Sequence, residues 1–378
     1  MIPPILLFLL ILSILVFVHA LGHFLAAKKN GVDVEEFGLG IPPRAIGKKF
    51  GKTLYSLNWL PIGGFVKIRG EDYTNYDPKD KSNFMNKSPL QKSVILLAGV
   101  FMNFVLAVVI FYFILGNQGF KSSPILLMGD YVFPYGNTES LPAVVTFVEA
   151  GSPAEKSGIK FADRIVSITD GTTTANINDT NDLKDYLKDK TGVEVILSTV
   201  NINTDEPNVY KAVPEYREQA GQAGIGVGLG EAVRIDYASP VGKAFSGFSH
   251  AGNIISYSFS MMGSLFAQSF SEKSLAPVSA GFSGPVGIFG AVKSILDYGG
   301  NKVFITILDL SAVLSLSLAI MNLLPIPALD GGRWMFVLCE WITRKKVSRK
   351  FEDRAHQIGF VFLIGLLLLI TAKDLFSL

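Results

Sequence analysis

Long runs of apolar residues dominate the hydrophobic pattern of this chain. The runs at 5–27 and 93–115 are each long enough for a helix to cross about 30 Å of hydrocarbon. A third run, at 303–328, is interrupted by serines and prolines, and a fourth, at 358–372, is compact and strongly apolar. The pattern predicts a polytopic α-helical membrane protein with about four transmembrane helices, at 1–28, 93–116, 301–332 and 356–378.

Shorter alternating patterns lie between the runs. Residues 53–68 read as two strands about a Pro/Gly turn, which predicts a β-hairpin at 53–70 within the segment 29–92. Alternation at 144–170, 193–200 and 225–229 predicts an α+β domain within 117–235. The segment 236–300 is predicted as an interfacial amphipathic helix and loop. Residues 241–270 could instead span the membrane, but the parity of crossings favours the interface.

Basic residues set the predicted orientation. Lys28, Lys29, Arg44, Lys87 and Lys92 place the segment 29–92 in the cytoplasm. A second basic cluster places the loop 333–355 on the same side, with Arg333, Arg344, Lys345, Lys346, Arg349 and Lys350. Both termini and the α+β domain are then extracytoplasmic. The first run lacks a basic leader and a small-residue cleavage site, so we expect a permanent helix rather than a signal peptide.

Composition agrees with a membrane protein, and it argues against a nucleic-acid-binding protein and against a site built from several cysteines. The chain of 378 residues is 49% hydrophobic and only 17% charged. A net charge of +2, explained by topology, does not indicate nucleic acid binding. The single cysteine, Cys339, allows neither an internal disulfide nor a cysteine zinc cage.

Two histidines stand inside the first apolar run, where ionisable groups are costly and usually functional. His19 and His23 are four residues apart, so on a helix both side chains face the same way and can bind one metal ion. In the H-E-x-x-H pattern a glutamate follows the first histidine and handles the protons of the attacking water. Ala20 occupies that position in this chain.

A third ligand is expected because catalytic zinc takes three protein ligands and keeps one open position. Asp330 is the best candidate. His23 precedes Lys28 by five residues and Asp330 precedes Arg333 by three, so both approach the same membrane face. Pro325 and Pro327 break the helix nearby, as is tolerated at membrane depth only where backbone lines a cavity or is buried. His250 and His356 are alternative ligands that no spacing selects.

The motif His-x-x-Gly-His in the first run, joined to Asn-x-x-Pro-x-Pro-x-Leu-Asp-Gly at 322–331, resembles the site-2 protease family of intramembrane zinc metalloproteases. The bacterial RseP-type members are the most similar. The resemblance implies one Zn²⁺ per chain on His19, His23 and Asp330, with Asn322 helping to hold substrate. Ala20 then stands where the family has its general base.

The resemblance also implies roles for the accessory segments. The β-hairpin resembles a membrane-reentrant element whose edge clamps an extended substrate, which assigns substrate contacts to Gly63, Gly64, Phe65 and Val66, and with them Pro325 and Pro327. Residues 149–168 are similar to the signature of a single extracytoplasmic PDZ domain. Asn103 and the segment 283–287 resemble further family signatures.

The resulting hypothesis is a protease of regulated intramembrane proteolysis, in a bacterial cytoplasmic (inner) membrane. It would cleave transmembrane segments of single-pass proteins or signal-peptide remnants, in some cases after an upstream site-1-type protease. Because alanine cannot transfer protons, we expect this chain to be inactive. The alternatives are a natural pseudoprotease that binds without cutting, and a transporter or channel with a PDZ sensor. An aspartyl protease is disfavoured, because Asp309 and Asp330 lie at different depths.

Overall fold

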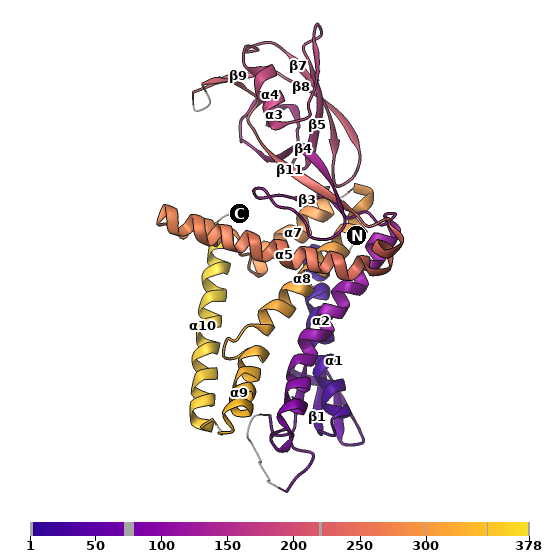
Figure 1. Ribbon diagram of the computed structural model, residues 1–378, viewed down its shortest axis with the longest axis vertical. Helices are drawn as coiled ribbons and strands as arrows, with labels where there is room; N and C mark the ends of the chain where they lie inside the picture. Colours follow the sequence, from indigo (N-terminus) through magenta and orange to yellow (C-terminus); the bar gives the residue numbers. More distant parts are fainter. Residues whose placement is uncertain (1–2, 72–78, 219–220, 299, 346, 377–378) are drawn as a thin grey trace. The chain divides into compact units, whose positions relative to one another are not determined.

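The computed structural model describes residues 3–71, 79–218, 221–298, 300–345 and 347–376, and the chain divides into two compact units. The first, called here the helical unit, comprises Met1–Phe111, Met262–Leu296 and Ile307–Leu378. The second, the β unit, comprises Tyr112–Met261 and Asp297–Thr306. Figure 1 shows the elements of both units.

Four helices among the described residues are long and apolar enough to cross a membrane. They are α1 (Pro4–Lys29), α2 (Pro89–Asn117), α8 (Val303–Leu323) and α10 (Arg349–Phe376). A 3₁₀ turn, η2 (Gly300–Lys302), precedes α8. Lys346 of the predicted basic cluster lies outside the described residues. With its β-sheets, the chain is therefore a membrane protein that carries a β domain.

The helical unit contains a sheet of two long, bent strands, β1 (Val34–Phe50) and β2 (Thr53–Ile68). The first part of β1 pairs with both halves of β2, since Phe37 lies opposite Tyr55 on one side and Val66 on the other. The predicted hairpin within 53–70 was therefore wrong in its pairing, because β1 separates the two halves. The glycines and prolines of β1 hid its strand character in the sequence.

Several shorter helices complete the helical unit: η1 (Phe84–Asn86), α6 (Ala276–Ala280), α7 (Pro285–Tyr298) and α9 (Asp330–Thr343). The third span was predicted at 301–332 with a break at Pro325 and Pro327, and the structure divides this range between two helices. α8 ends at Leu323, and a loop leads to α9, which begins at Asp330. α9 also occupies much of the range predicted as a basic loop, and α10 begins seven residues before the predicted 356.

The β unit is built on one antiparallel sheet in the order β3-β11-β4-β5-β7-β8, with β6 paired to β5. The strands are β3 (Ile125–Leu126), β4 (Asn137–Val148), β5 (Asp163–Thr169), β6 (Thr174–Asn176), β7 (Val195–Asn201), β8 (Pro207–Ala212) and β11 (Val227–Asp236). A separate pair consists of β9 (Glu215–Arg217) and β10 (Gln222–Gly224).

Two short helices cover the core of this sheet. α3 (Pro153–Ser157) begins at a Ser152 cap and ends at Gly158 in the left-handed region, while α4 (Thr180–Leu187) begins with a capping box. Leu183 and Leu187 of α4 are buried in the core. The 33-residue helix α5 (Pro240–Glu272) follows the sheet and continues from the β unit into the helical unit.

Candidate metal centre

His19 and His23 project from one face of α1, as their spacing predicts. Their rings lie 4.8 Å apart between centroids, and their Nε2 atoms are 3.1 Å apart. The His23 side chain is 10% exposed and that of His19 is 16% exposed. Two imidazole nitrogens thus meet at one point in a shielded environment.

Asp330 reaches this point from the first residue of α9. The two glycines that follow let α9 begin tightly against the preceding segment. A Cβ on Gly331 would lie 2.3 Å from the carbonyl oxygens of Leu323 and Leu324, and one on Gly332 would lie 2.2 Å from that of Ile326. Only glycine fits at either position, so the Asp-Gly-Gly sequence places the carboxylate.

The three donor atoms form a nearly equilateral triangle. Oδ2 of Asp330 lies 3.0 Å from Nε2 of His19 and 3.2 Å from Nε2 of His23. Around a tetrahedral zinc ion bonded at roughly 2.0–2.2 Å, ligand atoms stand about 3.3 Å apart. Among the described residues, these three form the group of His, Cys, Asp and Glu side chains able to hold a metal ion. Two imidazoles and one carboxylate fit zinc in both number and chemistry.

A backbone carbonyl orients His23. Nδ1 of His23 donates a hydrogen bond to the Ile95 carbonyl oxygen of α2, over 2.8 Å. This bond places the ring proton on Nδ1 and leaves the lone pair of Nε2 directed at Asp330. A metal-binding histidine requires this tautomer.

Asn103 stands behind His19 in a similar way. Its amide lies 3.4 Å from Nδ1 of His19, and its Oδ1 is buried without a hydrogen-bond partner. Turning the amide by 180° brings Oδ1 to the Nδ1–H of His19 and satisfies both groups. Ser315 of α8 donates from Oγ to the Asn103 carbonyl oxygen, 2.8 Å away. Asn103 and Ser315 therefore join three helices behind the site.

Glycine lets α2 approach the histidines. A Cβ on Gly99 would lie 2.3 Å from Nε2 of His23 and 2.8 Å from Nε2 of His19. Conversely, a Cβ on Gly22 would lie 2.3 Å from the Ala98 carbonyl oxygen. In the sequence, Gly99 and Asn103 belong to the segment that resembles a family Gly-Pro-x-x-Asn signature, with Val100 in place of the proline, but no contact with the histidines was assigned to Gly99. Its spacing of four residues from Asn103 puts both on the face of α2 that the histidines contact.

The other predicted site residues surround this group without joining it. Ala20 is buried between the two histidines on α1, at 4% exposure. Asn322 lies in the last turn of α8, where its amide donates to the Leu318 carbonyl oxygen of its own helix. Pro325 and Pro327 lie in the loop between α8 and α9.

The glycines of β2 lie against α1 just before His19. The backbone N–H of Gly63 donates to Oγ of Ser13 over 3.1 Å, and a Cβ on Gly64 would lie 3.4 Å from Phe17. Phe65 and Val66 continue the strand, paired with Gly38 and Phe37. This half of β2 therefore runs along the helix that carries both histidines.

The two alternative histidines have other partners. Nδ1 of His250, in the β unit, lies 3.1 Å from the Tyr237 hydroxyl. Nδ1 of His356, on α10, accepts a hydrogen bond from the Ala328 backbone N–H over 2.7 Å. Neither belongs to the group that can hold the metal.

Apolar spanning helices around a His–His–Asp group define a metalloenzyme site of a membrane protein. The chain belongs to the site-2 proteases, because Peptidase family M50 matches residues 7–366. It is 33% identical to a protein from Clostridium perfringens over 97% of each chain. It is 32% identical to one from Clostridium acetobutylicum and to one from Fusobacterium nucleatum, over 97% of this chain in both cases. All three carry the name "Putative zinc metalloprotease". The family therefore implies a zinc metalloprotease.

Proposed function

We propose that this chain is an intramembrane zinc metalloprotease scaffold that binds transmembrane segments of single-pass proteins or signal-peptide remnants. The proposal rests on three donor atoms that lie 3.0–3.2 Å from one another. Two of these atoms belong to a helix that is apolar enough to span a membrane. When bound, zinc supplies Lewis-acid polarisation of a water molecule and of the scissile carbonyl. His19, His23 and Asp330 would hold it.

Ala20 occupies the position that carries the general base in an H-E-x-x-H site. The general base of an H-E-x-x-H site takes a proton from the attacking water and passes it to the leaving amine. The methyl group of Ala20 can do neither. We therefore propose that this chain binds zinc and substrate but hydrolyses peptide bonds poorly or not at all.

The second half of β2 is the proposed substrate-binding strand. Gly64–Lys67 pairs with β1 along one edge, and no strand in the described part of the chain pairs with its other edge. A helical substrate must become extended before its peptide bonds can be attacked, and strand addition would hold it extended. Ile41, Ile46, Phe50, Leu57, Trp59 and Leu60 of the same sheet are at least 46% exposed, which supports contact with lipid.

The β unit is proposed to be a PDZ domain. A groove of about 720 Å³ lies along α4 and the start of β11, with Leu183 and Leu187 on one wall and Ile225 and Val227 on the other. β3 pairs only with Ala232 and Val233, which leaves the preceding edge of β11 without a strand partner among the described residues. Such an edge beside an apolar groove suits an extended chain end.

The topology read from Lys and Arg placement completes the proposal. Both termini and the β unit would face outward from a bacterial cytoplasmic membrane, with the metal centre toward the cytoplasmic side. An upstream site-1-type protease would supply substrates with shortened outer segments, which the PDZ domain would admit. A natural pseudoprotease is the second candidate function, because Ala20 removes the proton acceptor. Retention of the three ligands favours instead an engineered replacement of glutamate at position 20, because a protein released from catalysis has no chemical need for all three.

Zinc analysis and a restored variant test the proposal. The purified chain should contain one zinc per molecule, and His19→Ala should contain none. Ala20→Glu in proteoliposomes should cleave a single-pass membrane peptide that the unchanged chain leaves intact. Absence of zinc from the unchanged chain would overturn the metal centre. Zinc without cleavage by Ala20→Glu would favour the pseudoprotease.

A further inference from the structure

The loop that carries Asp330 to the histidines has little regular structure of its own. It connects Leu323 at the end of α8 to Asp330 at the start of α9. Ala328, two residues before the carboxylate, has φ of +81°, in a region that residues other than glycine rarely occupy. Such a conformation persists only where surrounding contacts hold it. The position of Asp330 therefore depends on what holds Ala328.

A backbone hydrogen bond from the Leu329 N–H to the Ile326 carbonyl oxygen, 3.1 Å long, closes the turn around Ala328, and α10 supplies a second contact. The backbone N–H of Ala328 donates to Nδ1 of His356 over 2.7 Å. One turn further along the same face of α10, a Cβ on Gly359 would lie 2.2 Å from the Pro327 carbonyl oxygen. His356 thus accepts a hydrogen bond from the loop at the point where Gly359 allows α10 to pack closely against that loop.

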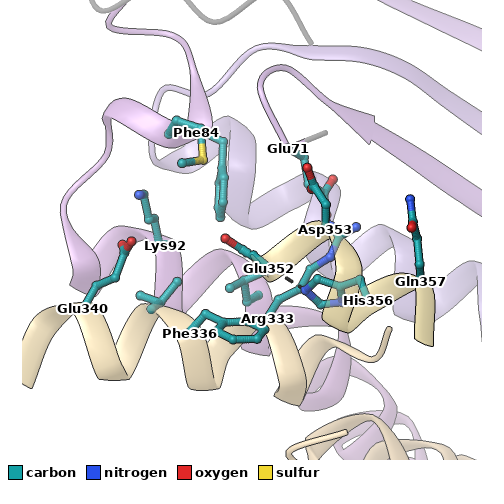
Figure 2. A pocket seen from close by; sticks show the side chains of 13 residues that line it. Glu71, Phe84, Lys92, Arg333, Phe336, Glu340, Glu352, Asp353, His356 and Gln357 are labelled. Atoms are coloured by element: carbon teal, nitrogen blue, oxygen red, sulfur yellow. Dashed lines mark hydrogen bonds and ion pairs between the residues drawn. The ribbon is translucent and has the colours of Figure 1, made fainter. Parts of the chain in front are cut away.

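Neighbouring side chains fix the His356 ring. Figure 2 shows His356 in the wall of a cavity of about 300 Å³, where α9 and α10 meet. The Phe336 ring packs edge-on at 5.6 Å between centroids. Nε2 of His356 lies 4.0 Å from Oε1 of Glu352, one turn earlier on α10. The ring therefore presents Nδ1 to Ala328 in one orientation.

We infer that His356 is a positioning residue, which holds the Ala328 loop so that the Asp330 carboxylate meets both imidazoles. It is no metal ligand, because Nδ1 already accepts the Ala328 N–H. The inference rests on the zinc centre proposed above and adds to its support a side chain from α10. Loss of such outer partners typically weakens metal affinity about 10–100-fold.

Replacing His356 by asparagine or by glutamine distinguishes this role from a general need for a polar side chain at position 356. The Oδ1 of an asparagine can occupy the position of Nδ1, whereas the longer glutamine places its oxygen beyond it. We expect His356→Gln and His356→Leu to bind zinc about 10–100-fold more weakly, and His356→Asn to retain most of the affinity. Gln357→Leu, an exposed neighbour that lines the same cavity, is the matched control.

The measurements are zinc affinity by chelator competition and the visible spectrum of the Co²⁺-substituted full-length chain in detergent. The Co²⁺ bands should change in His356→Gln and remain in His356→Asn and Gln357→Leu. Equal affinities and spectra for unchanged protein and His356→Gln would overturn the role of His356 alone. A folded His356→Asn variant that binds zinc as weakly as His356→Gln would also overturn the role of His356. This comparison tests the role even if His356→Leu does not fold. An unchanged chain without zinc would overturn the metal centre and this inference together.

Discussion

Gly99 of α2 lies so close to His23 of α1 that a Cβ on the glycine would be 2.3 Å from the imidazole Nε2. The atom it would strike is a donor atom of the proposed metal centre, so a side chain here would displace the proposed ligand itself. A flexible neighbour could move away, but His23 is also bonded to the Ile95 carbonyl oxygen on the same helix. The close approach of α1 and α2 is therefore part of the proposed metal centre.

The first prediction concerns Gly99→Ala. The added methyl group should force α2 away from α1 and lower zinc affinity at least about 10-fold, with a stability loss of about 1–3 kcal/mol from overpacking. Isothermal titration with zinc and thermal unfolding of the purified chain measure these effects. Gly116→Ala, at a position on α2 with open space around it, is the control. Unchanged zinc affinity in Gly99→Ala would contradict the close packing.

The second prediction concerns Asn103, which stands behind His19. Asn103→Leu keeps the size but removes the acceptor for the His19 Nδ1–H, so zinc affinity should fall about 10-fold or more. Asn103→Asp restores an acceptor and should recover affinity. Ser315→Ala removes only the hydroxyl that supports the Asn103 backbone and should cost about 1 kcal/mol of stability. A binding constant in Asn103→Leu equal to that of the unchanged chain would show that His19 needs no such partner.

The third prediction is a pH dependence in the β unit. Burial lowers the pKa of His250 from its ordinary 6.5 to about 4. The unfolded chain therefore takes up a proton that the folded chain refuses, and stability falls as pH decreases from 6.5 toward 4. At 1.36 kcal/mol per pH unit, the loss is about 3 kcal/mol.

Hydrogen exchange of the α5 segment around His250 measures this loss in the full-length chain. His250→Asn keeps an acceptor near the Tyr237 hydroxyl, 3.1 Å from Nδ1, but does not titrate. The hydrogen-exchange protection of the α5 segment should vary less between pH 6.5 and 4 in His250→Asn than in the unchanged chain. The same pH dependence in both proteins would rule out His250 as the cause.

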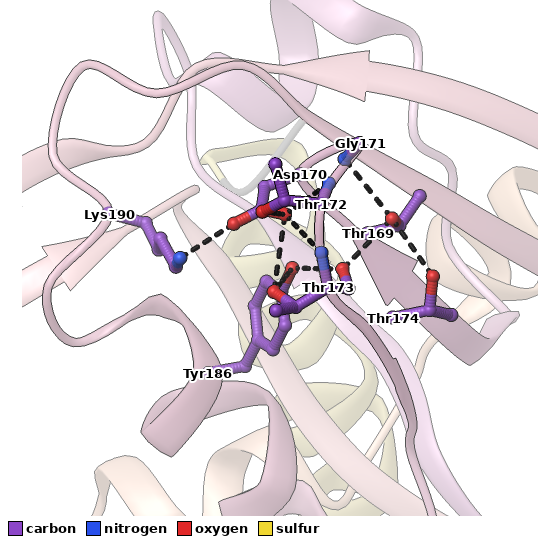
Figure 3. Close-up of polar contacts among 8 residues, drawn as sticks. All are labelled: Thr169, Asp170, Gly171, Thr172, Thr173, Thr174, Tyr186 and Lys190. Atoms are coloured by element: carbon purple, nitrogen blue, oxygen red, sulfur yellow. Dashed lines mark hydrogen bonds and ion pairs between the residues drawn. The ribbon is translucent and has the colours of Figure 1, made fainter.

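The fourth prediction concerns Asp170, which organises the turn after β5 (Figure 3). Its carboxylate, 7% exposed, accepts from Lys190 Nζ over 2.6 Å and from the backbone N–H groups of Thr172 and Thr173 over 2.9 and 2.7 Å. The hydrogen bond from Lys190, followed by those from the threonines, holds the pKa of Asp170 far below its usual range. This stabilisation is present above the ordinary pKa of 3.8 and is lost as pH falls below it.

Asp170→Asn should therefore lower the unfolding temperature of the β unit at neutral pH, because the amide accepts fewer hydrogen bonds and pairs poorly with Lys190. Limited proteolysis of the turn at rising temperature measures the effect. Asp185→Asn, an exposed position on α4, serves as the reference. Equal protection of the turn in both variants would mean that the Asp170 contacts do not stabilise it.

The fifth prediction concerns α5. Its exposed aromatic residues fall on one face at helical spacing: Phe245, Phe248, Phe259, Phe266 and Phe270. On the other side, Asn253 and Tyr257 bond to backbone atoms of Tyr135 and Leu126. We expect the aromatic face to lie about 5–10 Å deep in the lipid interface. Nitroxide labels can be placed singly at Phe259→Cys and Tyr257→Cys in a Cys339→Ser background. The label at position 259 should report shallow burial in lipid, and the label at position 257 should report an aqueous or protein environment. Depth near the bilayer centre at Phe259 would instead indicate a spanning helix.

Much about this protein follows from its sequence. Residues in four apolar runs form helices long enough to span a membrane, because a helix satisfies its own backbone hydrogen bonds in lipid. The spacing of His19 and His23 places their side chains together on any α-helix. Matching depths along the chain also singled out Asp330, and the structure brings it within 3.2 Å of both imidazoles.

Only the tertiary structure decided how these residues are held. β1 pairs with both halves of β2, a contact between distant residues that local alternation does not encode. The start of α9 at Asp330 depends on Gly331 and Gly332 packing against carbonyl oxygens, and the roles of Gly99 and His356 depend on which helices become neighbours. Helical periodicity specifies which side chains share a face, but packing specifies what that face meets. The three residues that form the group able to hold a metal ion could therefore be predicted from sequence, whereas the contacts that hold them in place could not.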